Sequence, residues 1–372
     1  MDVVIIGGGL GGLCAALDLR QRGYAVTVVE RQRYPFHRVC GEYISNEVLP
    51  YLHRLNADPA ALGPARITRL QVSSPAGRRL TSELPLGGFG VSRYALDYFL
   101  YQRAIQSGVE IRQQTTATQV TFDAARNEHQ VVLADGTTLT ARVVLGAYGK
   151  RSALDRQFAR PFFTQRSPYL GVKYHLRYSS MPRDLIELHN FADGYAGISA
   201  IEDDKYCFCY LTTRQNLKTH GTIPQLEAQV LAHNPRLRHI LETAEVLYPQ
   251  PEVINEISFA PKTCLEDHVL LCGDAAGLIT PLCGNGMAMA IHGASLAAAH
   301  THEFLQHRIT RPALEKAYSS DWHQYFGGRL RTGRAVQRLF GQPLLSELVV
   351  NGLRLWPAAV RQLIRRTHGQ PF

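Results

Sequence analysis

The chain has 372 residues, of which 45% are apolar and 19% charged, with 31 glycines and 19 prolines. This composition is typical of a globular protein of two or three domains, and it excludes a disordered, collagen-like or coiled-coil chain. The formal net charge is +9, but eight arginines lie between Arg329 and the last residue, against a single acid, Glu347. A basic excess confined to the tail argues against a nucleic-acid-binding protein, in which it would spread over a face of the fold.

Seven cysteines are spread along the chain, and several lie inside apolar stretches, as reduced core thiols do. Cys207 and Cys209 form a C-x-C pair on one expected strand, but no second pair follows at the spacing of a zinc site. We therefore expect no structural metal and a reducing compartment. No stretch reaches the roughly 18 uninterrupted apolar residues of a membrane span, which indicates a cytoplasmic protein, either free or peripheral at the membrane.

The first 22 residues carry the strongest motif of the sequence. Residues 3–6 form a short apolar run, as expected for a buried parallel strand, and residues 13–22 have the pattern of a helix. Between them, Gly7, Gly9 and Gly12 fit the G-x-G-x-x-G spacing of a dinucleotide-binding loop. Such glycines allow a tight turn and let a pyrophosphate approach the backbone, so we expect phosphate binding at the start of the helix.

A second apolar strand, residues 25–29, ends in Glu30, 18 residues beyond Gly12. A carboxylate at this place can accept both hydroxyls of an adenosine ribose. The acid favours FAD or NAD over NADP at this site, although Arg31 follows it directly.

A second motif separates FAD from NAD. The apolar run 269–272 ends in Gly273 and Asp274, and Pro281, residues 284–287 and a long Ala- and Gly-rich stretch to about residue 303 follow. An extended FAD needs this second unit, because its ribityl chain must be held beyond the pyrophosphate. The N-terminus of the helix expected after residue 284 would stabilise the negative charge of reduced flavin.

With both motifs in place, the chain resembles the FAD-dependent oxidoreductases of the para-hydroxybenzoate hydroxylase fold, in their geranylgeranyl reductase and flavin-dependent halogenase branch. The resemblance covers roughly residues 1 to 310. Its features are Gly7, Gly9 and Gly12 with Glu30, the segment 38–42 (Arg-Val-Cys-Gly-Glu), Ser92 and Arg93 with Asp97, and residues 271–274 with Pro281 and 284–286.

The resemblance implies roles for single residues: Asp274 binds the ribityl hydroxyls, Arg93 approaches FAD from its helix, and Ala117 lies beside the adenine. It also implies NADH or NADPH as the electron donor. The motifs and the resemblance together predict a cofactor site of Gly7, Gly9, Leu10, Gly12, Glu30, Arg31, Arg38, Cys40, Arg93, Ala117, Gly149, Gly273, Asp274, Pro281, Gly284, Asn285, Gly286 and Met287.

The chain departs from these relatives in two motifs. Tyr148 stands before Gly149, where the family has an acid that helps to order the pyrophosphate side and the path of the nicotinamide donor. Gly197 stands where halogenases and reductases have a tryptophan in their aromatic motif, and Tyr195 alone is retained. We expect more room above the flavin at Gly197, which argues against halogenation.

Cys40 is the candidate catalytic residue. Reduction of a C=C bond needs a hydride and a proton, and the family places a cysteine of this segment near the isoalloxazine. Glu42 or Tyr43 can serve as the acid instead, and Cys40 can equally be a small side chain that fills space before Gly41.

Two stretches, residues 67–91 and 166–257, consist of short alternating segments, which predicts an antiparallel sheet over the substrate. On one of its strands Lys173, His175 and Arg177 line a cavity or, as we expect, a solvated sheet face.

The fold class is therefore α/β: an FAD-binding Rossmann-like domain of the GR2 type, an inserted antiparallel β substrate domain and a helical C-terminal cap. The expected parts are residues 1–66, 92–165 and 258–328 (FAD-binding, the second with a β meander), 67–91 and 166–257 (substrate), and 329–372 (basic helical region). This last region can pack on the fold, as we expect, or lie on an anionic membrane or an acyl-carrier protein.

The sequence thus predicts an FAD-dependent oxidoreductase, linked to NADH or NADPH, that transfers hydride to a C=C bond. The expected partner is a small apolar or aromatic substrate of isoprenoid, polyene or quinone-like type, free or carrier-bound, and no nucleic acid. The first alternative is an FAD-dependent monooxygenase that hydroxylates an aromatic or polyene substrate. The second alternative is a flavoprotein without catalytic activity.

Overall fold

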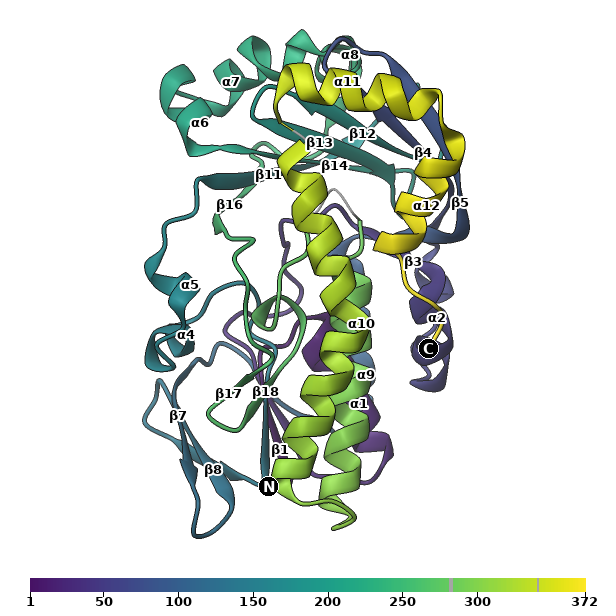
Figure 1. Ribbon diagram of the computed structural model, residues 1–372. Coiled ribbons are helices and arrows are strands. Elements are labelled where there is room, and N and C mark those ends of the chain that lie inside the picture. The colour runs from purple at the N-terminus through teal and green to yellow at the C-terminus, as the bar shows by residue number, and fades with distance from the viewer. Residues whose placement is uncertain (281–283, 340) are drawn as a thin grey trace.

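The computed structural model describes residues 1–280, 284–339 and 341–372. Pro281, which the sequence assigns to the cofactor site, lies outside these residues. The molecule is elongated, with a parallel sheet in one half and a larger sheet in the other (Figure 1). The long helix α10 (Arg311–Leu339) runs from the first half to the second.

The first sheet has six strands in the order β17-β18-β10-β1-β2-β6. All neighbours are parallel except β17 and β18. The strands are β1 (Val3–Ile6), β2 (Val26–Val29), β6 (Glu110–Arg112), β10 (Val143–Gly146), β17 (Leu265–Glu266) and β18 (Val269–Leu271). The residues of β1, β2, β10 and β18 are all buried, which explains their uninterrupted apolar sequences.

Helices and a small sheet cover this parallel sheet. Helix α1 (Leu10–Gln21) packs against α3 (Arg93–Gln106) and α9 (Gly286–Leu305), and α9 packs against α10. A separate antiparallel sheet contains the strands β7 (Ala117–Asp123), β8 (Glu128–Leu133) and β9 (Thr138–Ala141). The first helix begins three residues earlier than the sequence pattern indicates, directly after the glycine loop.

The second sheet has nine strands, in the order β15-β11-β14-β13-β12-β4-β5-β3, with β16 also paired to β11. They are β3 (Tyr43–Ser45), β4 (Ala65–Ser73), β5 (Arg79–Gly90), β11 (Tyr169–Arg177), β12 (Leu185–Phe191), β13 (Gly194–Ala200), β14 (Tyr206–Thr213), β15 (Glu245–Val246) and β16 (Glu252–Ile257). The prediction of a wholly antiparallel sheet is wrong at one place, because β4 and β12 pair in parallel. This pairing joins the two sequence stretches expected to form the sheet.

The remaining helices lie mainly over the second sheet and at the chain end. They are α2 (Leu49–Arg54), α4 (Ala153–Gln157), α5 (Pro161–Thr164), α6 (Arg214–His220), α7 (Ile223–Gln229), α8 (Pro235–Thr243), α11 (Pro343–Arg354) and α12 (Pro357–Thr367). Four short 3₁₀ helices are η1 (Asn46–Val48), η2 (Pro59–Leu62), η3 (Leu231–His233) and η4 (Gly273–Ala275). Helices α6, α7 and α8 lie beyond the second sheet at the end of the molecule (Figure 1).

The C-terminal cap begins inside α10, because Arg329 lies within that helix. Arg329 is buried and forms an ion pair with Glu47 at 3.3 Å, so the expectation of solvated tail arginines is wrong at this residue. Among the helices of residues 1–280, 284–339 and 341–372, none is long and apolar enough to cross a membrane.

Candidate FAD and substrate site

The glycine loop joins β1 to α1 at the carboxyl end of the parallel sheet. Gly7 has a φ of 107°, a conformation that side chains rarely adopt. A Cβ atom at Gly12 would overlap the Gly7 carbonyl oxygen, so the loop can close this tightly only with glycine at that position. The first N–H groups of α1, including that of Leu10, follow Gly9, which offers no capping side chain, so they are available to an anion.

Glu30 holds this loop in place. Its carboxylate accepts hydrogen bonds from the backbone N–H of Gly8 at 2.8 Å and of Gln32 at 2.9 Å. The Arg38 guanidinium lies 3.3 Å from the same carboxylate. A carboxylate has about four acceptor positions, so Glu30 keeps capacity for a ribose hydroxyl.

Two arginines and an aspartate extend the site from Glu30. Arg93 donates two hydrogen bonds to Asp97, at 2.7 and 2.8 Å, and Arg38 donates one to the same carboxylate at 3.0 Å. Asp97 thereby fixes both guanidinium groups beside the glycine loop, where the Arg93 Nη2 atom lies 3.6 Å from the place of a Cβ at Gly9. The arrangement puts positive charge where an FAD pyrophosphate would need it.

Asp274 follows Gly273 in the 3₁₀ helix η4. Its carboxylate has no hydrogen-bond partner among the described residues. Burial raises the pKa of Asp274, while the charges of Lys262, Arg93 and Lys150 lower it in part. An unpaired carboxylate in this place fits the ribityl hydroxyls of FAD.

Lys150 and Lys262 flank Asp274. Lys262 Nζ donates hydrogen bonds to the backbone oxygens of Lys150, at 2.7 Å, and Asp274, at 2.8 Å. Burial lowers the pKa of Lys150 and that of Lys262 to about 8 each, although the nearby acids oppose this effect. Lys262 could not be predicted from the sequence, because it lies in a loop without a recognisable motif.

The N-terminus of α9 faces the same region. Gly284 has a φ of 64°, and a Cβ there would lie 3.2 Å from the Tyr43 ring. Asn285 donates a hydrogen bond from Nδ2 to the Thr367 carbonyl at 2.6 Å, but within the described residues its buried Oδ1 has no partner. Gly286 begins the helix and Met287 is buried in its first turn. An orphan acceptor and an open helix start fit a ligand that carries donors, such as a flavin ring.

Tyr148 occupies the place of the family's acid, but a different acid lies next to it. The Tyr148 hydroxyl donates to Asp155 at 3.2 Å, and Asp155 forms a buried ion pair with Arg160 at 2.8 Å. Arg160 also donates to the Ala275 carbonyl at 2.9 Å. Gly149, with a φ of 84°, has no atom of the described chain within 4 Å of a Cβ position. Asp155 lies in α4, seven residues after Tyr148. Through its ion pair with Arg160, which bonds to Ala275, it orders the turn that contains Asp274.

Two further predicted cofactor residues lie at the edge of the site. Arg31 is exposed. Its charge lowers the pKa of Lys150, but less than burial and the Arg151 charge do. Ala117 is buried at the start of β7, two residues after Thr115, whose N–H donates to the Glu30 carbonyl at 3.1 Å. The contacts of all predicted cofactor residues with FAD stay predictions.

Cys40 lies between this region and the second sheet. Its backbone oxygen accepts a hydrogen bond from the Cys207 thiol at 3.2 Å. Burial raises the pKa of the Cys40 thiol, although the Arg93 charge lowers it in part. The Cys40 side chain packs against the apolar core of the cofactor half, and the Arg93 charge acts on both Cys40 and Asp274. The thiol therefore stays protonated at neutral pH.

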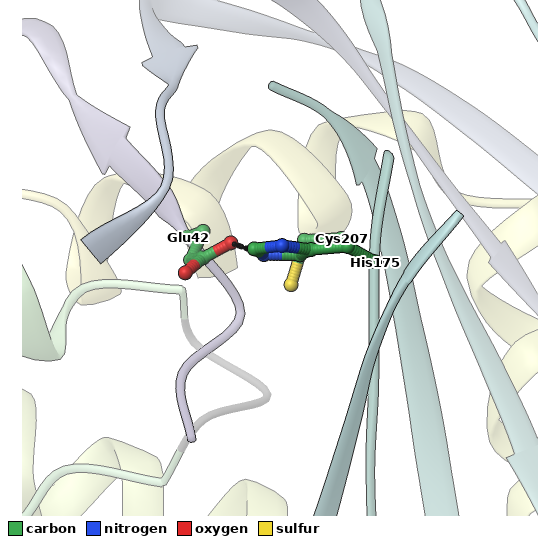
Figure 2. A group of neighbouring side chains, drawn as sticks. All are labelled: Glu42, His175 and Cys207. Carbon is green, nitrogen blue, oxygen red and sulfur yellow. Dashed lines mark hydrogen bonds and ion pairs between the residues drawn. The ribbon is translucent and has the colours of Figure 1, made fainter. Parts of the chain in front are cut away.

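Glu42 is the centre of a buried charged cluster (Figure 2). Its carboxylate forms an ion pair with Lys173, lies 2.7 Å from His175 Nε2 and accepts a hydrogen bond from the Arg93 N–H at 2.8 Å. Although burial raises the pKa of Glu42, Lys173 and His175 lower it to about 2. The expectation that Lys173 and His175 face solvent is wrong, because both are buried against Glu42, while Arg177 is exposed as expected.

Glu42, His175 and Cys207 also lie close enough together to hold a metal ion. Lys173 already neutralises Glu42, and burial raises the pKa of Cys207 well above its ordinary value, so the thiol stays protonated. A metal would require a thiolate and the loss of the lysine contact. We interpret the group as an ion-pair cluster that joins the 38–42 segment to β11.

Apart from the Glu42 cluster, the second sheet also contributes to a small apolar cluster. Tyr195, Leu211, Ile257 and Val336 form one buried cluster. Partly buried side chains packed against it come from the same sheet, from the segments after β16 and η4, and from the cap: Tyr169, Leu188, Ile254, Phe259, Leu278 and Leu363. The expected room at Gly197 is partly taken by Leu188, whose Cδ2 lies 3.3 Å from the place of a Cβ at Gly197.

The family of this chain follows from its similarity to known proteins. The model of the FAD binding domain family matches residues 1–325 of the chain. The chain belongs to this family. The protein is thus an FAD-dependent enzyme, and the free Asp274 carboxylate, the open glycine loop and the start of α9 fit that cofactor.

Individual relatives of this FAD-dependent enzyme fall into more than one class. It is 24% identical over 312 residues to menaquinone reductase of Mycobacterium tuberculosis, covering 80% of this chain and 75% of that protein. It is 25% identical over 336 residues to digeranylgeranylglycerophospholipid reductase of Methanosphaerula palustris, covering 86% and 81%. PqsL of Pseudomonas aeruginosa, described as a probable FAD-dependent monooxygenase, superposes with a TM-score of 0.76 at 19% identity, covering 94% of this chain and 99% of that one.

Proposed function

We propose that the enzyme uses NADH or NADPH to reduce a C=C bond of an apolar substrate of isoprenoid, polyene or quinone-like type. The observation that carries the proposal is the position of Cys40, whose side chain packs against the core of the cofactor half while its backbone oxygen accepts a hydrogen bond from Cys207 of the second sheet. Burial raises the pKa of this thiol, which keeps its proton available at neutral pH. The names of the menaquinone and digeranylgeranylglycerophospholipid reductases agree with this chemistry.

The residues around the glycine loop, Asp274 and the start of α9 would hold FAD, which when bound and reduced would supply a hydride to one carbon of the double bond. The Cys40 thiol gives a proton to the other carbon, which leaves a saturated bond and a thiolate. The positive charges of Arg93 and Lys173 favour that thiolate, because both lower the pKa of Cys40. The thiolate then takes a proton from solvent, so the residue returns to its starting state.

The pKa directions of the three groups support Cys40 over the two other acids that the sequence leaves open. Glu42 has a pKa of about 2, so it is ionised at neutral pH and has no proton to give. Tyr43 is buried next to Gly284 and His368. Burial raises the pKa of both Tyr43 and Cys40, but the Arg93 and Lys173 charges lower that of Cys40 in part, whereas the Glu47 charge raises that of Tyr43 further.

The test is anaerobic turnover of the FAD-loaded enzyme with NADPH or NADH, using menaquinone and digeranylgeranyl glycerophospholipid as probes. We expect a product that has gained two hydrogens in the absence of oxygen, measured by mass spectrometry. Product that forms only with oxygen, and carries one added oxygen atom, would establish the monooxygenase alternative. FAD that neither donor bleaches with either probe would instead support a flavoprotein without this activity.

Cys40→Ser tests the role of the thiol. We expect the variant to bind FAD and to be reduced by the donor at the normal rate, but to form product about 100-fold more slowly, as the loss of a general acid predicts. Cys264→Ser is the matched control, because Cys264 is a buried thiol that donates its hydrogen bond to Ser319. Unchanged product formation in Cys40→Ser would exclude Cys40 as the proton donor.

A further inference from the structure

Helix α11 carries apolar side chains on two opposite faces. Its inner face packs on the second sheet through Val350, which is fully buried. On its outer face Leu344 is 84% exposed and Leu348 is 71% exposed. Leu355, which caps the helix in helical conformation, is 87% exposed. An outward apolar face on a helix that already buries another one is unusual for a helix that only packs on its own fold.

The outer side chains form a ridge. Successive helical residues are rotated by about 100°, so Leu344, Leu348 and Leu355 fall within about 40° of one another. Trp356 follows directly and is 70% exposed. These four are the most exposed large apolar side chains of the described chain.

Unpaired arginines accompany the ridge. Arg354 ends α11, and Arg361, Arg365 and Arg366 lie on the exposed side of α12. None of the four has an ion-pair partner in the part of the chain that the structure describes. The one acid of this segment, Glu347, is turned toward the fold, where it accepts hydrogen bonds from Ala76 and Asn351.

We propose that this α11–α12 surface, made of Leu344, Leu348, Arg354, Leu355, Trp356, Arg361, Arg365 and Arg366, docks the enzyme onto a membrane that contains anionic lipids. Leucines on a convex ridge can enter the acyl region, a tryptophan prefers the interface, and arginines bind lipid phosphates. The proposal goes beyond the reaction, and it holds whichever substrate the enzyme takes.

Two other occupants fit the surface less well. A second copy of the chain, related by a two-fold axis, would bring these arginines against the same arginines, because such an interface uses one patch on both subunits. An acidic carrier protein would match the arginines, but its charges would not match the exposed leucines and Trp356. A lipid surface satisfies both features at once.

The inner side of α12 adds a consequence for the site. Leu363 packs against the apolar cluster that contains Tyr195 and Val336. The helix that exposes its arginines to the solvent therefore also borders this apolar cluster. A membrane-bound enzyme would hold the cluster close to the lipid from which an apolar substrate comes.

The sequence provides its own optical probe for the test. It has two tryptophans, and Trp322 is buried at 4% exposure while Trp356 is largely exposed. The FAD-loaded enzyme is mixed with vesicles of phosphatidylglycerol and phosphatidylcholine, or of phosphatidylcholine alone. We expect co-sedimentation with the anionic vesicles, weaker binding at high salt, and a blue shift of the Trp356 emission that Trp356→Phe abolishes.

Single variants test the apolar and the basic residues of this surface separately. Leu348→Ser should weaken vesicle binding about tenfold, as the transfer of one leucine predicts. Arg365→Glu should weaken it at least fivefold, as the loss of one arginine near an anionic surface predicts. The controls are Ile105→Ser and Arg126→Glu, since both residues are exposed on the cofactor half of the molecule, and we expect normal binding for both.

Every other outcome overturns the proposal. Absence of sedimentation and of an emission shift with anionic vesicles means that the surface does not dock on lipid. A blue shift that grows with protein concentration without vesicles points to self-association. Equal binding by Leu348→Ser, Arg365→Glu and the unmodified enzyme means that another surface binds the vesicles, and binding only to an acidic carrier protein assigns the surface to that partner.

Discussion

Glu42 shows how one residue can hold two halves of a molecule together. Its backbone has a φ of 55°, an uncommon conformation for a residue with a side chain. Its carboxylate, 0% exposed, contacts Lys173 and His175 on β11 and the Arg93 N–H at the start of α3. The cofactor segment that contains Cys40 is thereby fixed against the substrate sheet, and the charge that does this is fully removed from water.

Glu42→Gln should lower the free energy of unfolding by about 3–5 kcal/mol at pH 7, because it leaves Lys173 buried without its counter-charge. Since the pKa of Glu42 lies near 2, below its ordinary value of 4.5, the stabilisation is complete above about pH 4.5 and is lost as the pH falls toward 2. Denaturant unfolding at several pH values measures the difference between the two proteins, which should shrink in acid.

The double variant Glu42→Gln with Lys173→Met is the control for this prediction. Removal of both charges should restore part of the lost stability, because no unpaired charge remains. A single variant that unfolds at the same denaturant concentration as the unmodified protein would show that the ion pair does not stabilise the fold.

Asp274→Asn should weaken FAD binding about 10- to 100-fold, since charge-assisted hydrogen bonds to the ribityl hydroxyls are lost. Titration of the FAD-free protein, followed by flavin fluorescence, measures the dissociation constant. Asp203→Asn is the matched control, because the Asp203 side chain is 79% exposed in a turn of the second sheet. Equal affinity in the two variants would remove Asp274 from the predicted cofactor site.

At the scale of the element, the glycine loop contains glycines that are needed for two different reasons, one for the fold and one for the ligand. Gly12 is required by the fold, because a Cβ would overlap the Gly7 carbonyl oxygen. Gly9 has a φ of −84°, and the nearest described atom to a Cβ there is Arg93 Nη2, at 3.6 Å. The protein itself thus leaves room for a side chain at Gly9, and the predicted pyrophosphate does not.

Gly12→Ala should therefore lower the melting temperature of the FAD-free protein, whereas Gly9→Ala should leave it unchanged. With FAD added, the unmodified protein should gain thermal stability and Gly9→Ala should gain much less, because ligand stabilisation follows affinity. Gly352→Ala is the control, since this glycine lies in α11 and no described atom lies within 4 Å of a Cβ there. If Gly9→Ala gains the full stabilisation, the pyrophosphate does not approach Gly9.

Some elements could be predicted from a few neighbouring residues, whereas others depend on partners far along the chain. β1, the glycine loop and the strand before Gly273 could be predicted, because burial on both faces and a tight turn leave marks within a few residues. Alternation in β11 correctly indicated a strand, but it could not tell a solvated face from one buried against Glu42, 131 residues earlier. The parallel pairing of β4 with β12 could not be predicted from a local sequence pattern either, because register depends on partners far along the chain.

At the scale of the whole molecule, the C-terminal helices join the two halves. Asn285 at the start of α9 bonds to Thr367, and the Phe372 ring stacks on His292 with centroids 3.9 Å apart. Val350, Val360 and Ile364 belong to the core of the second sheet. The cap is thus part of the fold on its inner side, whatever its outer side binds.

Deletion of residues 343–372 should leave little folded protein. It removes three buried aliphatic side chains, worth about 1.5–3 kcal/mol each, which together approach the stability of a typical domain. Far-UV circular dichroism and soluble yield measure the effect. Leu344→Ser with Leu348→Ser should melt normally, because both side chains are exposed. A deleted protein that still folds and binds FAD would show that the cap is an independent unit.

The pairing of β4 with β12 also sets an order for biosynthesis. Gln71 and Glu187, which bond across this pair, are 116 residues apart. A ribosome adds about 5–20 residues per second, so the nascent β4 edge waits roughly 6–23 seconds for its neighbour. During that interval an unpaired strand is open to other chains, and chaperones that shield emerging polypeptides should therefore raise the yield of this enzyme more than added cofactor does.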